Sequence, residues 1–147
     1  MRRGSGTIVL LAGAVSLLLG TGAALALTKA GTRGPDRLVG TKAADSLRGG
    51  RGADRLLGRG GRDRLGGGAG RDFLIGGPGG DRLVGGPGRD EFNANGRTRS
   101  GAAGNDLIRA RDRAQDLIEC GPGRDVAIVD RTEDGVFDCE TIREPAG

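Results

Sequence analysis

The sequence predicts an all-β solenoid built from nine-residue repeats that run without gaps from Gly31 to Asn93. Three observations predict it: an aspartate at every ninth residue, glycines at fixed positions before it, and one large apolar residue two positions after it. The seven aspartates are Asp36, Asp45, Asp54, Asp63, Asp72, Asp81 and Asp90.

Each repeat combines a glycine-rich turn with a very short strand. The seven units read GTRGPDRLV, GTKAADSLR, GGRGADRLL, GRGGRDRLG, GGAGRDFLI, GGPGGDRLV and GGPGRDEFN. Glycine permits positive φ and close backbone packing, so the first six positions predict a turn. Side chains alternate along a strand, so the last three positions predict a strand whose apolar eighth residue points inward.

The spacing of the acidic turns suits a calcium ion. A coil of turn, strand, turn and strand closes after two units, so residues 18 apart stack and the aspartates form two columns. Stacked strands lie about 4.8 Å apart and Ca²⁺ accepts oxygens at about 2.4 Å, so carboxylates and turn carbonyls of two stacked turns can hold one ion. About five such sites are expected. The turn glycines assigned to them are Gly50, Gly52, Gly68, Gly70, Gly77, Gly79, Gly86 and Gly88.

The unit GGxGxD followed by any residue, an apolar residue and any residue resembles the RTX, or haemolysin-type, calcium-binding nonapeptide repeat. Residues 67–92 match that pattern at every glycine, aspartate and apolar position. The resemblance implies a right-handed parallel β-roll in which aspartates and glycine-turn carbonyls hold Ca²⁺. It also implies a short secreted bacterial calcium-binding protein.

Some units depart from the pattern. Thr32, Thr41 and Arg59 replace the second glycine, Ala43 replaces the fourth, and arginines flank several aspartates. A neighbouring guanidinium opposes cation entry, so we expect weaker binding than in an arginine-poor version, with the first two units least suited to calcium. The alternative is that the aspartates form ordinary exposed pairs with arginine. Because a glycine-rich chain loses much entropy on folding, we expect the roll to be largely unfolded without Ca²⁺.

The N-terminal segment predicts export. Two arginines precede an apolar run and an Ala-Leu-Ala ending, which is typical of a helical signal peptide over residues 1–26, cleaved after Ala26. The alternative is an uncleaved anchor, since residues 7–27 are long enough to cross a bilayer. Residues 27–30 are expected to form a short linker, and the mature protein to be secreted, with no membrane attachment after cleavage.

The tail predicts weaker copies of the repeat and then a cap. Residues 94–128 are expected to continue the solenoid as degenerate coils, with Asp106 as a further ligand and Asp116 and Asp125 as less certain ones. Residues 129–147 are expected to cover the open end as a hairpin. An alternative for this segment is a cation site formed by Asp130, Asp134 and Asp138.

The two cysteines, Cys120 and Cys139, predict one disulfide in an exported chain, and two free thiols in a reducing compartment are the alternative. Histidine is absent from the sequence, which excludes His-based zinc sites and triads. We therefore expect no enzymatic activity.

Charge suggests two other functions. Residues 31–93 carry 12 basic against 8 acidic residues, whereas residues 94–147 carry 8 against 11. The Arg-Gly runs of the basic half suggest a polyanion- or nucleic-acid-binding protein, but regular acids and the lack of interleaved aromatics argue against nucleic acid. A calcium-independent cell-surface adhesion solenoid is the other alternative. The favoured prediction is an extracellular calcium-binding module whose other partners are cell-surface or extracellular macromolecules.

Overall fold

The computed structural model describes residues 16–17, 25–94, 104–130 and 135–144, and these form β-strands joined by turns, with no helix among them. Two sheets face each other. The eight-stranded sheet contains β1 (Ser16–Leu17), β2 (Leu27–Ala30), β4 (Ser46–Arg51), β6 (Arg64–Ala69), β8 (Arg82–Val84), β10 (Leu107–Ala110), β12 (Val126–Val129) and β14 (Thr141–Arg143). The six-stranded sheet contains β3 (Arg37–Val39), β5 (Arg55–Leu57), β7 (Phe73–Ile75), β9 (Glu91–Asn93), β11 (Leu117–Glu119) and β13 (Gly135–Phe137).

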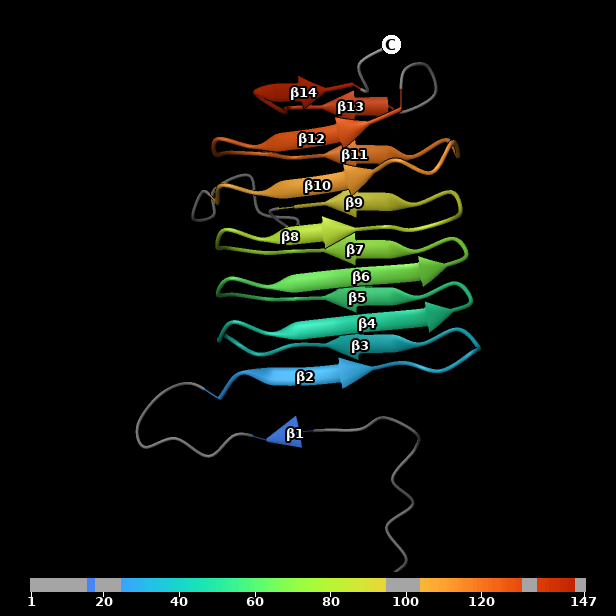
Figure 1. Ribbon diagram of the computed structural model, residues 1–147. Helices are drawn as coiled ribbons and strands as arrows, with labels where there is room; N and C mark the ends of the chain where they lie inside the picture. The colour runs from blue at the N-terminus through green and yellow to red at the C-terminus, as the bar shows by residue number, and fades with distance from the viewer. Residues whose placement is uncertain (1–15, 18–24, 95–103, 131–134, 145–147) are drawn as a thin grey trace, which may run out of the picture.

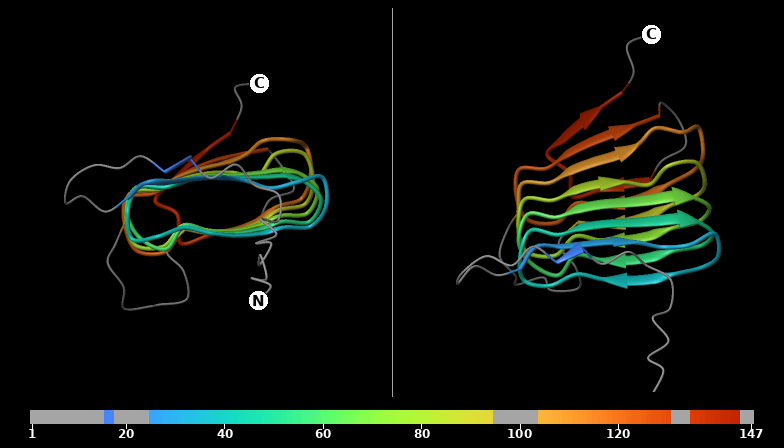
Figure 2. Two further views of the ribbon diagram at one scale, coloured as in Figure 1. Left: turned by 90° about the horizontal axis from the view of Figure 1, so that it is seen from below. Right: turned by 60° about the horizontal axis from the view of Figure 1, so that its bottom comes forward.

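From β2 onward, successive strands alternate between the two sheets, so each coil contributes one strand to each sheet (Figure 1). All strand pairs are parallel except β1 with β2. The register joins residues 18 apart, as in Leu47 opposite Leu65 and Leu56 opposite Leu74. Seen along its axis, the stack is a flattened oval with the acidic turns at its two ends (Figure 2). The predicted all-β parallel solenoid is confirmed.

The core is a single file of side chains between the two sheets. The eighth residue of each repeat points into it, and from Leu47 to Phe92 these residues are at most 2 % exposed. Ile108, Ile118 and Ala127 extend the file through the later coils, each fully buried. Burial of apolar surface stabilises a fold by about 25 cal/mol per Å². The stabilisation from this core is small, because each coil supplies only two large side chains.

Beyond Asn93 the repeats vary in length, but the strands still stack in the same two sheets. Residues 95–103 lie outside the described residues, and β10 beyond them pairs with β8 so that Ile108 stacks on Leu83. β11 likewise stacks on β9, with Ile118 over Phe92. The described residues 104–130 therefore add further coils to the solenoid.

Three local features differ from expectation. β4 and β6 each span six residues rather than three, since the second-position glycines Gly50 and Gly68 also pair in register. Leu27–Ala30, expected to be a linker, forms β2 and pairs with β4, because the edge of β4 offers unpaired backbone groups. The predicted signal-peptide helix lies mostly outside the described residues; of those described within it, Ser16–Leu17 form β1, and Leu25 and Ala26 are in neither helix nor strand.

The C-terminal end is not a hairpin, because β13 pairs with β11 while β14 pairs with β12, each in parallel. The last strands thus add one more coil, and Cys120 and Cys139 join that coil to the one before through a disulfide. The predicted disulfide is present. Within the described residues, no helix is long and apolar enough to span a bilayer.

Candidate metal sites in the stacked turns

Hydrogen bonds arrange the aspartates in two columns. From Asp54 onward, each column aspartate accepts, through Oδ1, a hydrogen bond from the backbone N–H of the aspartate in the preceding coil, at 2.7–2.8 Å. One column contains Asp36, Asp54, Asp72, Asp90 and Asp116. The other contains Asp45, Asp63, Asp81, Asp106 and Asp125. The two predicted columns are therefore present, and the tail aspartates extend them.

These carboxylates are buried. From Asp45 to Asp125, every aspartate of the two columns is 1–3 % exposed, whereas Asp36 in the first coil is half-buried. Each follows a turn and precedes an outward-facing strand residue, so the pleat directs it into the turn rather than toward solvent. Exposed Asp–Arg pairs, the alternative reading of the sequence, do not describe these buried groups.

The second carboxylate oxygen, Oδ2, gives the strongest indication of a metal site. A buried charged oxygen without a partner is costly, so natural proteins pair such atoms with donors or metal ions. In most coils Oδ2 is buried and has no hydrogen-bond partner among the described residues. This holds for Asp54, Asp63, Asp72, Asp81, Asp90, Asp106 and Asp125.

A backbone carbonyl converges with Oδ2 on the same small space. A Cβ placed on Gly49 would lie 2.3 Å from Asp54 Oδ2 and 2.4 Å from the carbonyl oxygen of Gly67 in the next coil. At Gly76 the corresponding distances are 2.4 Å to Asp81 Oδ2 and 2.5 Å to the Ala94 carbonyl oxygen. At these two coils, first-position glycine leaves open the gap where these oxygens meet, and a Cβ would fill it.

Second- and fourth-position glycines bring successive turns into close contact. The predicted turn glycines all have positive φ, from +100° at Gly86 to +138° at Gly79. A Cβ on Gly70 would lie 2.0 Å from the Gly52 carbonyl oxygen, and one on Gly68 would lie 2.0 Å from the Gly50 carbonyl oxygen. Glycine at these positions lets the turns stack with their carbonyl oxygens in the space between coils. The eight glycines are Gly50, Gly52, Gly68, Gly70, Gly77, Gly79, Gly86 and Gly88.

The stacked carboxylates repel one another. Burial, together with the charge of the stacked neighbours, raises the pKa of Asp63 to about 6, that of Asp81 and of Asp106 to about 7, and that of Asp90 to about 8. Burial also raises the pKa of Asp72 above its usual value. A proton or a cation must therefore compensate these groups near neutral pH, and bound Ca²⁺ would favour the ionised form instead.

The donor set fits a hard cation. The described residues contain no group of three or more acidic, cysteine or histidine side chains that could hold a metal alone, so any ion between the turns would also take backbone carbonyls. Carboxylate and carbonyl oxygens are the ligands that Ca²⁺ prefers. The bare Oδ2 atoms and converging carbonyls supply both.

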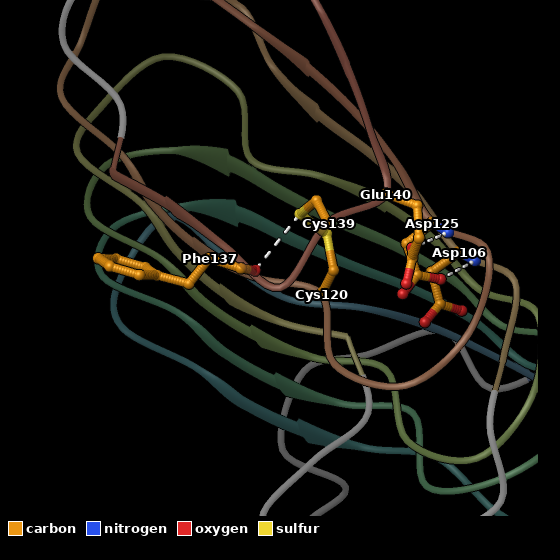
Figure 3. Close-up of a disulfide and its surroundings, with 6 residues drawn as sticks. All are labelled: Asp106, Cys120, Asp125, Phe137, Cys139 and Glu140. Atoms are coloured by element: carbon orange, nitrogen blue, oxygen red, sulfur yellow. Dashed lines mark hydrogen bonds between the residues drawn. A yellow bond between two sulfur atoms is a disulfide. The ribbon is translucent and has the colours of Figure 1, made fainter.

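The structure adds two carboxylates that the sequence analysis did not assign. Asp112 Oδ2 accepts a hydrogen bond from the Gly88 N–H at 2.7 Å, where a third-position carbonyl serves in earlier coils. Glu140 Oε2 accepts one from the Asp125 N–H at 2.7 Å and so ends the second column, next to the disulfide (Figure 3). The sequence held a signal for Glu140, because it precedes Thr141–Arg143 as each repeat aspartate precedes its strand.

Comparison with known protein families agrees with this geometry. A model described as "RTX calcium-binding nonapeptide repeat (4 copies)" matches residues 30–65 and 58–92. No curated protein and no solved structure matches the chain. The glycine and aspartate positions that the match covers are those that form the stacked turns. Residues 30–92 thus match the RTX calcium-binding nonapeptide repeat, by sequence pattern and by the stacking of their turns.

Proposed function

We propose that this protein binds several Ca²⁺ ions in the gaps between stacked turns and that binding drives the folding of the solenoid. The observation that carries the proposal is the row of buried aspartate Oδ2 atoms without a hydrogen-bond partner. Asp54, Asp63, Asp72, Asp81 and Asp90 would supply carboxylate oxygens, and Asp106 would do so beyond the interruption. The carbonyl oxygens of the turn glycines would complete the coordination.

The chain's own residues prepare the gaps in which calcium would compensate the buried carboxylates. Oδ1 is held by the backbone N–H of the preceding coil, which fixes each carboxylate and leaves Oδ2 for the ion. Without the ion, stacked negative charges oppose one another in a buried setting, and the narrow core adds little to offset the entropy of a glycine-rich chain. Folding is therefore expected to depend on Ca²⁺.

Calorimetric titration with CaCl₂, followed in parallel by circular dichroism, tests the proposal. The expected result is uptake of several ions with a gain of β-sheet signal, and a spectrum unchanged between excess chelator and millimolar CaCl₂ would refute it. Asp90→Asn and Glu91→Gln form a matched pair, because each removes one negative charge from adjacent positions. Asp90 is buried in the turn column, whereas Glu91 lies in β9 at the outer face. Only Asp90→Asn should lower the number of bound ions.

We further propose that the protein acts outside the cell as a non-catalytic structural or interaction module. The signal-peptide pattern of residues 1–26 and the disulfide between Cys120 and Cys139 support this, since disulfides persist in oxidising compartments and extracellular calcium is plentiful. Sequencing the N-terminus of protein recovered from culture medium tests it. A mature chain starting at Leu27 is expected, and an intact chain retained in the cytoplasm would contradict it.

A further inference from the structure

The first turn of each column differs from those that follow. In the second repeat, the Thr41 N–H donates to Asp45 Oδ2 at 2.5 Å, and Thr41 Oγ1 lies 3.0 Å from the same oxygen. In the first repeat, the Thr32 N–H donates to Asp36 Oδ2 at 2.5 Å, and Thr32 Oγ1 lies 2.9 Å from it. Two donors thus bind the oxygen that has no hydrogen-bond partner in the coils from Asp54 to Asp106.

The identity of the second residue explains this difference. Where it is glycine, as at Gly50, Gly68 and Gly77, φ lies between +106° and +116°. Neither threonine has positive φ, because a β-branched side chain disfavours that region. The backbone N–H of the second residue therefore has a different partner in the two kinds of turn. The Gly77 N–H donates to the Ala94 carbonyl in the next coil, whereas the Thr41 N–H donates to Asp45 in the same repeat.

The gap itself is conserved in shape at these turns. A Cβ placed on Gly40 would lie 2.5 Å from Asp45 Oδ2 and 2.5 Å from the Gly58 carbonyl oxygen, as at the first-position glycines of later coils. Thr41 Oγ1 also accepts a hydrogen bond from the Ala43 N–H at 3.0 Å, which holds its hydroxyl in the turn. The threonine N–H and hydroxyl therefore satisfy the carboxylate oxygen that a cation would otherwise bind.

We propose that Thr32 and Thr41 close the first turn of each column with hydrogen bonds that take the place of a calcium ion, so that the calcium columns begin at Asp54 and Asp63. This inference rests on the proposed calcium binding. The first coil is then complete without metal and gives the calcium-dependent coils a preformed edge on which to stack. Threonine at the second position becomes the residue that decides whether a turn takes an ion.

Thr41→Gly and Thr32→Gly test the inference. Each variant should bind about one more Ca²⁺ per chain than the unaltered protein, measured by equilibrium dialysis with metal analysis. Each should also need a higher CaCl₂ concentration for half-maximal folding, because its aspartate Oδ2 has no partner until the ion binds, and should fold fully in saturating CaCl₂. Ala43→Gly is the matched control, since it adds the same flexibility to the same turn while leaving both threonine donors. Thr41→Ser keeps the hydroxyl, and both controls should retain the original ion count.

The outcomes separate this inference from the proposed function. If the unaltered protein binds no calcium, the proposed function fails. If it binds calcium but the two glycine variants show the same count, the threonine inference is overturned and the proposed function stands. If both glycine variants remain unfolded in saturating CaCl₂, the inference is also overturned, because calcium would have failed to replace the hydrogen bonds.

Discussion

Replacement of Gly70 by alanine should unfold the middle of the solenoid, whereas the same change four residues earlier, at Gly66, should be tolerated. Gly70 has φ of +136°, and a Cβ on it would lie 2.0 Å from the Gly52 carbonyl oxygen. At Gly66, φ is ordinary and the nearest such atom, the Leu47 carbonyl oxygen, lies 4.0 Å away. The two positions therefore differ in backbone conformation and in space, but not in the atom added.

The expected loss at Gly70 is the sum of two effects. A left-handed conformation costs a residue with a side chain about 1–2 kcal/mol, and forcing an extra methyl against rigid backbone costs about 1–3 kcal/mol. Gly70→Ala should therefore lower the free energy of unfolding by about 2–5 kcal/mol, a large part of the ~5–15 kcal/mol typical of a domain. Gly66→Ala should change it by no more than about 1 kcal/mol, in the stabilising direction.

Urea denaturation in saturating CaCl₂, with circular dichroism as the probe, measures both variants on the same scale. The Gly70 turn also borders the gap beside Asp72. The CaCl₂ concentration for half-maximal folding should therefore rise in Gly70→Ala and stay unchanged in Gly66→Ala. Equal stability of the two variants, within about 0.5 kcal/mol, would refute the stacking of turn glycines on the carbonyls of the preceding coil.

Three further predictions follow from buried charge, backbone strain and the cross-link. In calcium-free buffer the folded solenoid should lose stability as pH rises through 6 to 8. Burial raises the pKa of Asp63 to about 6 and that of Asp90 to about 8, so the folded state holds protons that the unfolded chain has released. Thermal melts at several pH values would contradict this if stability rose with pH instead. Arg59→Gly should raise the free energy of unfolding by about 1 kcal/mol, since Arg59 has φ of +85°, and a lower urea midpoint would argue against it. Replacing Cys120 and Cys139 by serine should cost about 3 kcal/mol and expose the last coils to hydrogen exchange first, whereas equal exchange along the whole solenoid would contradict a local role.

The acid dependence and the calcium dependence have one origin. Protonation and metal binding are two ways of compensating the same stacked carboxylates, so acid should partly replace calcium in supporting the fold. Calcium binding at pH 7 to a chain that is already folded would release protons from groups such as Asp90, whereas binding to an unfolded chain would release few. Calorimetry in buffers of different ionisation enthalpy distinguishes these two routes.

Local sequence patterns predicted the positions of side chains well where a residue type has a single structural role. The eighth-position residues point inward because a strand alternates its side chains, and the aspartates stack because two nine-residue units close a coil. The tail was harder, because its units differ in length and because Ala110, at the end of β10, and Cys120, directly after β11, stand where earlier coils have glycine. Even so, Asp106 and Ile108 kept the spacing that places one in the turn and the other in the core.

The sequence by itself determined the period, the two columns and the inward file of apolar residues, since each follows from spacing within the chain. Only the tertiary structure decided what each carboxylate oxygen meets, because that depends on backbone φ in one turn and on the carbonyl of the next coil. It separates Asp36 and Asp45, whose Oδ2 atoms accept hydrogen bonds from threonine, from the column aspartates between Asp54 and Asp106, whose Oδ2 atoms have no hydrogen-bond partner among the described residues. It also turned the expected terminal hairpin into a further coil, because the edges of β11 and β12 accept parallel strands and the disulfide fixes them there.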